Sequence, residues 1–153
     1  MTDARLTSDA TAPRAGRVAR LRPNWPLLLI AGFMAPVGAQ AALFPRSFHD
    51  DFPVGRGWIA ATGGAYNEHL TRDVGVLFVA IVLATVWTAK TRAGDRAVAT
   101  AWIVQSVAHI LFHAAHLHEL ARADRVALLA SLAAVPVLAA AALRYPTSRL
   151  ADH

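Results

Sequence analysis

The chain has 153 residues, of which 56% are hydrophobic and only 16% are charged, and its formal net charge at pH 7 is +5. This length accommodates one domain, and the apolar excess excludes an ordinary soluble domain. Because the chain contains no cysteine, it can form no disulfide, thiolate nucleophile or sulfur-ligated metal site.

In chain order, a disordered basic tail is predicted first, over residues 1–24, which are rich in Arg, Ala, Thr and Pro. Apolar segments follow, each near the length of about 20 residues that a helix needs to cross a bilayer. They cover residues 26–44, 70–89, 97–117 and 126–143. Short connections after the second and third segments predict antiparallel neighbours. The predicted fold class is an all-α, four-transmembrane-helix antiparallel bundle over residues 25–145, with a second tail at residues 146–153.

The first apolar segment has a competing interpretation as a cleaved signal peptide, because Ala39, Gln40 and Ala41 form a small-x-small pattern. A typical signal-peptide core is shorter than this apolar run, and about 25 residues precede the run here. We therefore expect the segment to be retained as a membrane helix.

The basic residues divide unequally between the two predicted sides of the membrane. Ten lie on one side: Arg5, Arg14, Arg17, Arg20, Arg22, Lys90, Arg92, Arg96, Arg144 and Arg149. Five lie on the other: Arg46, Arg56, Arg72, Arg122 and Arg125. The positive-inside rule then predicts that both termini are cytoplasmic and that the first and third connections face outward. The lipid bilayer is the expected partner, and nucleic acid is not, because the basic tail has no aromatic interleaving or nucleic-acid motif.

The third segment carries three histidines on one face. At about 100° per residue, His109, His113 and His116 fall within an arc of roughly 60°. Gln105 extends this stripe inward, whereas His118 points away from it. One intramembrane histidine is commonly a structural hydrogen-bonder between helices. Three on one face favour a functional site, because polar groups in hydrocarbon are costly and tend to mark function.

The connection between the first two segments spans about 25 residues, and connections of that length are often functional. It runs into the motif YNEHLTRDVG at the start of the second segment. Here Arg72 and Asp73 are predicted to form an ion pair inside the outer end of the helix, where unpaired charges are expensive. Glu68 and His69 are expected at the same depth as the histidines of the third segment.

These two motifs carry a resemblance. YNEHLTRDVG opening a membrane helix, followed by a helix with a His-x3-His-x2-His pattern, is similar to an uncharacterised family of small four-helix integral membrane proteins of high-GC bacteria. The resemblance covers roughly residues 25–145. It implies the same fold and a multi-pass location in the bacterial inner membrane, and it implies no activity.

The strongest functional hypothesis is an outward-facing transition-metal site. Histidines four residues apart on a helix can share one ion, and copper, zinc or iron would suit imidazole and carboxylate ligands. Three helical histidines on one ion would be strained, because the first and third are about 10.5 Å apart along the axis. The expected ligands are drawn from His109, His113, His116, His69 and Glu68. The side chains expected to orient them are Asn67, Arg72, Asp73 and Gln105.

Two other classes of function are also compatible with the sequence. Haem or quinone could be bound by a histidine of the third helix, with only His69 able to oppose it. Alternatively, the protein could be a non-enzymatic accessory or scaffold subunit, whose alanine-rich fourth helix would allow close contacts in a homo-oligomer or with a membrane-complex partner. The sequence does not decide whether the protein is an enzyme.

Overall fold

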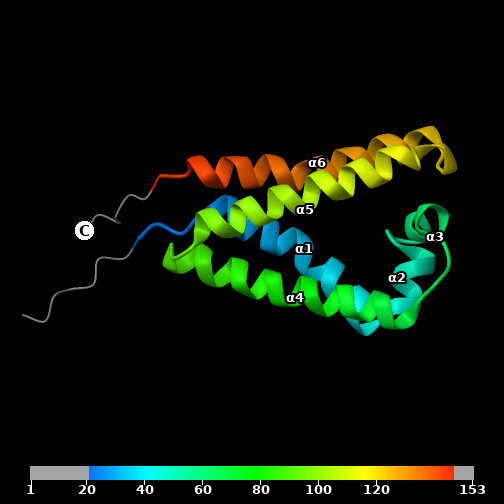
Figure 1. The fold of residues 1–153 in the computed structure, drawn as a ribbon, viewed down its shortest axis with the longest axis horizontal. Helices are drawn as coiled ribbons and strands as arrows, with labels where there is room; N and C mark the ends of the chain where they lie inside the picture. Colours follow the sequence, from blue (N-terminus) through cyan, green and yellow to red (C-terminus); the bar gives the residue numbers. More distant parts are fainter. Residues whose placement is uncertain (1–20, 147–153) are drawn as a thin grey trace, which may run out of the picture.

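The computed structural model describes residues 21–146, and this part of the chain is all-helical (Figure 1). Its long helices are α1 (Trp25–Leu43), α4 (Glu68–Thr91), α5 (Asp95–Ala115) and α6 (Arg122–Arg144). Its short helices are α2 (Pro45–Asp51), α3 (Trp58–Gly63) and the 3-10 turn η1 (Leu117–Glu119). All four long helices are long and apolar enough to cross a membrane. The predicted fold class is confirmed, whereas most of both predicted tails lies outside the described residues.

The ends of the four long helices differ from the predicted bounds by one to four residues, and two of these differences have local reasons. Helix α4 begins at Glu68, ahead of the predicted residue 70, because the Asn67 side chain accepts a hydrogen bond from the Leu70 N–H at 3.0 Å and caps the helix. Helix α5 ends at Ala115 rather than at residue 117, because the chain tightens into η1 at that point. His116 therefore lies just beyond the last helical residue.

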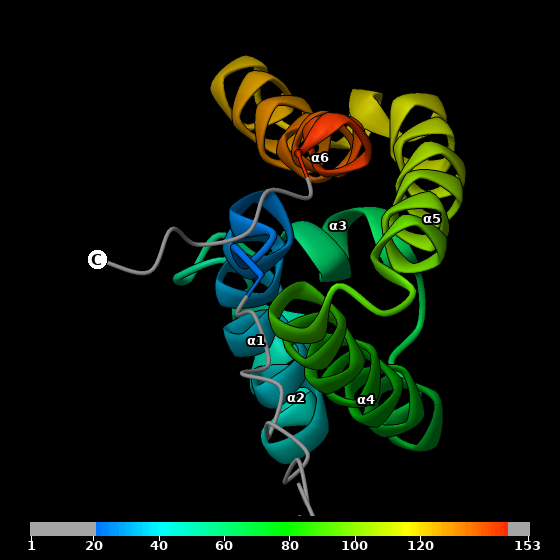
Figure 2. The ribbon, with the colours of Figure 1, turned by 90° about the vertical axis from the view of Figure 1, so that its left-hand side faces the viewer.

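The long helices form two packed pairs, α1 with α4 and α5 with α6, and α1 also contacts α6. Figure 2 shows these pairs end on. Although α4 and α5 are consecutive, they contact each other only slightly. In Figure 1 the two pairs lie close together where the described chain begins and ends, and they diverge toward the opposite end, which carries α2 and α3. We call these the terminal end and the loop end.

The tight contact between α1 and α4 depends on a glycine. A Cβ atom added at Gly75 would lie 2.7 Å from the Ala41 carbonyl carbon and closer still to the Ala42 nitrogen. Real Cβ atoms do not approach backbone so closely. The absence of a side chain at Gly75 therefore allows the two helix backbones to touch.

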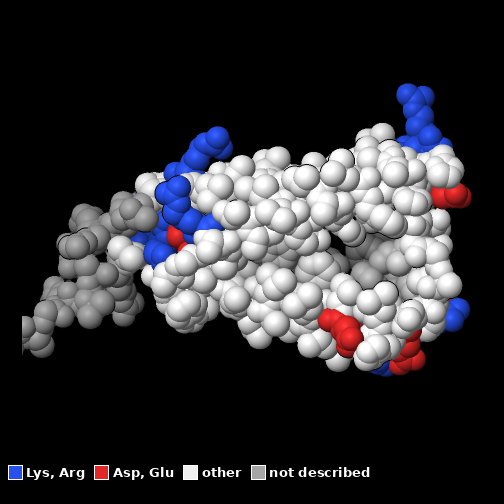
Figure 3. Space-filling model, in the orientation of Figure 1, with Lys and Arg blue, Asp and Glu red and all other residues white. Residues whose placement is uncertain are grey.

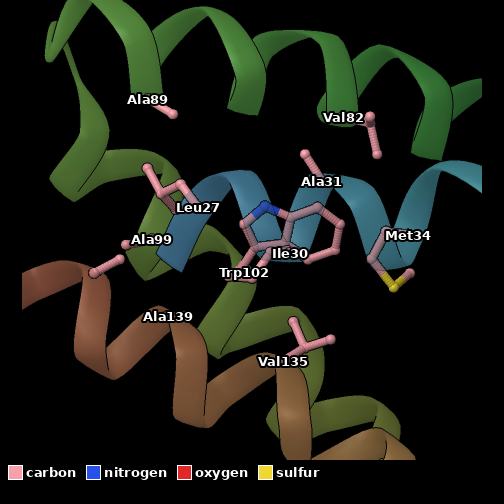
Figure 4. Close-up of a cluster of buried hydrophobic side chains, with 11 residues drawn as sticks. Leu27, Ile30, Ala31, Met34, Val82, Ala89, Ala99, Trp102, Val135 and Ala139 are labelled. Carbon is pink, nitrogen blue, oxygen red and sulfur yellow. The ribbon is translucent and has the colours of Figure 1, made fainter. Parts of the chain in front are cut away.

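All four long helices contribute to one apolar core near the terminal half of the bundle (Figure 4). Trp102 of α5 is its largest buried side chain, with 2% of its surface exposed. Its indole N–H donates to the Thr85 hydroxyl at 3.0 Å, and its ring stacks on Phe78 at a centroid distance of 6.3 Å. These contacts satisfy the one polar atom of the indole and join α5 to α4.

A buried ionic network that the sequence did not predict closes the terminal end. The Arg92 side chain, only 3% exposed, pairs with Asp95 at 2.8 Å. Its terminal nitrogens donate to the backbone carbonyls of Arg22, Tyr145 and Pro146 at 3.0–3.2 Å. Asn24 donates through Nδ2 to the Asp95 carboxylate at 3.1 Å and to the Ala142 carbonyl at 3.2 Å. This network of hydrogen bonds thus joins the start of α1, the α4–α5 connection and the end of α6.

The surface of the bundle separates charged ends from an apolar middle. Figure 3 shows Lys, Arg, Asp and Glu gathered toward the two ends of the face, with uncharged residues between them. Large apolar side chains are exposed on all four long helices, among them Leu29, Phe33, Leu77, Leu83, Val104, Leu111 and Val137. This arrangement is that of a multi-pass membrane protein whose middle contacts the lipid bilayer.

Candidate functional site

The candidate site begins with two histidines at the loop end of α5. His113 is buried, with 8% of its surface exposed, and shares the inward face of the helix with Trp102 and Ser106. His109, one turn earlier, is exposed. The two imidazole rings lie 4.6 Å apart between centroids and are nearly perpendicular, at 88°. Helical spacing alone brings these rings together, as the sequence predicted.

The buried imidazole has an unusual hydrogen-bonding state. Within the described residues, Nδ1 of His113 is shielded from solvent and has no hydrogen-bond partner. A buried polar atom without a partner typically costs about 1–3 kcal/mol, and such an atom in a native protein calls for an explanation. An imidazole nitrogen with a free lone pair is also a good ligand for a transition metal.

The third predicted histidine, His116, lies outside the helix that carries the other two. His116 follows the end of α5, and its Nδ1 lies 2.8 Å from the Phe112 carbonyl oxygen. Because a carbonyl oxygen only accepts, Nδ1 must carry the proton, and in the neutral ring Nε2 then keeps its lone pair. The ring also stacks on that of Phe112 at 4.5 Å. The expected stripe of three helical histidines is therefore a helical pair followed by one histidine in the turn.

The charged residues of α4 pair in a different way from the prediction. Arg72 bonds Glu68 at 2.9 Å and the Ala42 carbonyl at 2.8 Å, while Asp73 lies 3.3 Å from His69. The predicted Arg72–Asp73 pair is thus wrong. Consecutive helical residues point about 100° apart, whereas residues four apart face each other. The His69 side chain is 89% exposed, so these pairs lie on the surface of α4.

The two halves of the predicted ligand set belong to different helix pairs. Glu68 and His69 are on α4, which packs with α1, whereas His109 and His113 are on α5, which packs with α6. Among residues 21–146, no three His, Asp or Glu side chains gather as a metal-binding group. The structure brings together His109 and His113 but not the histidines of α5 with the motif of α4.

Of the residues expected to orient the ligands, Gln105 alone lies on α5, one turn before His109, and it is half-buried. Asn67 caps α4, and Arg72 and Asp73 make the pairs described above.

The long first connection joins the two helix pairs at the loop end. Helix α3 lies there between the two helix pairs (Figure 1). Trp58 packs against Leu120 and Leu128, and its indole N–H donates to Asp124 of α6 at 3.1 Å. Arg56 pairs with the same carboxylate. The sequence did not predict this bridge.

Comparisons with protein-family models, with curated proteins and with solved structures give no match to this chain.

Proposed function

We propose that the protein is an integral membrane protein that binds a transition-metal ion at the loop end of α5, with His109 and His113 as its paired ligands. The observation that carries this proposal is the buried His113, whose Nδ1 has no hydrogen-bond partner among the described residues and whose ring lies beside that of His109. Metal coordination would use the lone pair of a nitrogen that the surrounding helices leave unsatisfied.

The separation of the two rings supports a shared ion. A metal–nitrogen bond of about 2.0–2.1 Å places an ion about 3.2 Å from each ring centre. Where one nitrogen of each ring points at the same ion, two rings 4.6 Å apart correspond to a nitrogen–metal–nitrogen angle of about 90°. This angle suits square-planar copper(II), and a small ring rotation would reach the tetrahedral angle that zinc prefers.

Two imidazoles leave coordination positions open, which favours reversible metal handling over a closed structural site. His116 is a further candidate ligand, because its Nε2 keeps a lone pair while Nδ1 donates to the Phe112 carbonyl. Glu68 and His69 could join only if α4 and α5 approached each other at the loop end.

Metal binding by protein purified without a histidine tag tests the proposal. We expect about one copper, zinc or iron ion per chain, and copper(II) should give an electron paramagnetic resonance spectrum with nitrogen coupling. His109→Ala and His113→Ala should each weaken binding at least about tenfold. His118→Ala is the matched control, because His118 is exposed and its ion pair within the described residues is with Glu119. This variant should bind metal as the unaltered protein does.

Equal metal binding by the His113→Ala and His118→Ala variants would contradict the proposal. So would an optical spectrum with a haem Soret band that disappears in His113→Ala, since haem would then be the bound group.

We also propose that the protein lies in the bacterial inner membrane with the terminal end in the cytoplasm, following the unequal distribution of basic residues. Ala61 on α3 and Ala93 in the α4–α5 connection are both exposed, at opposite ends of the bundle. In this cysteine-free chain, Ala61→Cys should react with an impermeant thiol reagent in intact cells, and Ala93→Cys only after permeabilisation. The reverse labelling pattern would show that the orientation is inverted.

A further inference from the structure

A cleft with charged walls lies at the loop end, away from the histidine pair, between α2 and the start of α4. Its volume is about 580 Å³, within the range of about 300–1,000 Å³ that is usual for small-molecule sites. Its charged lining consists of Arg46, Asp50, Asp51, Glu68 and Arg72. The cleft thus combines two guanidinium groups with three carboxylates.

The arginines of this cleft are held in place but keep donors to spare. Arg46 bonds Asp50 through Nε at 2.5 Å, and its guanidinium carbon lies 5.0 Å from the centre of the Tyr66 ring. Arg72 bonds Glu68 through Nε at 2.9 Å. Among the hydrogen bonds of the described residues, the terminal nitrogens of Arg46 make none, and Nη2 of Arg72 makes none. Free guanidinium N–H groups are the donors with which arginine binds phosphate oxygens.

The carboxylates leave one negative charge unbalanced. Asp50 pairs with Arg46 and Glu68 pairs with Arg72, whereas Asp51 forms no ion pair within residues 21–146. A hydrogen bond from His49 and a second from Arg46 hold the pKa of Asp50 below its usual range, so that this carboxyl stays ionised at neutral pH. With three carboxylates and two guanidinium groups, the cleft favours a ligand that carries a cationic group as well as an anionic one.

The cleft also lies where the chain leaves the apolar span. Helix α1 ends at Leu43, and Phe44 lines the cleft. Both side chains are largely exposed, at 66% and 64%. A ligand with a zwitterionic group in the cleft could therefore extend an apolar chain along the lipid-facing surface of the bundle.

We infer that this cleft binds a phosphoethanolamine group, independently of any metal on α5. The phosphate is held by the free N–H groups of Arg46 and Arg72, and the primary ammonium donates hydrogen bonds to Asp51. A choline group has no N–H donor, so phosphocholine binds more weakly. The same chemistry is presented by a phosphatidylethanolamine headgroup and by a soluble glycerophosphoethanolamine.

Binding of defined lipids to the delipidated full-length protein in detergent tests this inference. Native mass spectrometry with short-chain phosphatidylethanolamine, phosphatidylcholine and phosphatidylglycerol should show tightest binding of the ethanolamine lipid, by about tenfold. Asp51→Asn should remove this preference and Asp51→Glu should restore most of it. Glu119→Gln is the control, since Glu119 is an exposed acidic residue at the loop end that pairs with His118 outside the cleft.

A competition experiment identifies whether the phosphoethanolamine group belongs to a membrane lipid or to a soluble compound. Competition by glycerophosphoethanolamine at concentrations comparable to those of the lipid would identify a soluble ligand, and its failure to compete would identify the membrane lipid. Equal binding of ethanolamine and choline lipids by the unaltered protein would overturn the inference, and so would an unchanged preference in Asp51→Asn.

Discussion

Replacing Gly75 with alanine is expected to force α1 and α4 apart and to destabilise the protein by about 3 kcal/mol, at the upper end of usual overpacking losses. The added methyl group would meet the backbone of Ala41 and Ala42, which cannot yield as a flexible side chain would. Loss of helical circular dichroism on heating in detergent measures this effect.

Gly32 supplies the matched control on the partner helix. Apart from its own stretch of helix, a Cβ atom at Gly32 would meet no atom of the described residues within 4 Å, so the added methyl group would face lipid. Gly32→Ala should leave stability unchanged or raise it by up to about 1 kcal/mol, because alanine favours the helix over glycine. Equal melting temperatures for Gly75→Ala and Gly32→Ala would show that the close contact of α1 and α4 does not exist.

Asp95→Ala is expected to cost about 3–5 kcal/mol of stability, because it leaves the buried Arg92 guanidinium without its counter-ion. Asn24 would lose an acceptor at the same time, so that the start of α1 also loosens from α5. Thermal unfolding again provides the measurement. Arg96→Ala, an exposed change one residue away, should alter stability by no more than about 0.5 kcal/mol.

The double variant Arg92→Leu with Asp95→Leu distinguishes a pair from two separate residues. Removing both charges should recover part of the loss of the single variant, since no isolated buried charge remains. Additive losses would instead indicate that the two side chains stabilise the fold independently.

The sequence alone determined the membrane helices, because their signal is local. An apolar segment of about 20 residues must satisfy its backbone hydrogen bonds internally when it crosses a bilayer, and a helix does so without any partner. The proximity of His109 and His113 was predictable for the same reason, since residues four apart on a helix are neighbours whatever surrounds them. Their 4.6 Å ring separation agrees with that expectation.

Other parts of the candidate site depended on the tertiary structure. The sequence indicated that Glu68 and His69 could reach the depth of the α5 histidines, but depth does not decide which helices are neighbours. Gly75 allows α4 to pack tightly on α1, whereas α5 packs on α6. The start of α4, which carries Glu68 and His69, therefore lies apart from the histidines of α5 at the loop end.

The buried ion pair illustrates the same limit. Membrane depth suggested Arg72 and Asp73, which the structure places on the surface of α4 in separate pairs. The buried pair is Arg92 with Asp95, and its burial arises because the chain entering α1 and the chain leaving α6 cover the α4–α5 connection. Such burial is a long-range property: it depends on segments about 50 to 70 residues away along the chain, whose arrival at the connection no local pattern records.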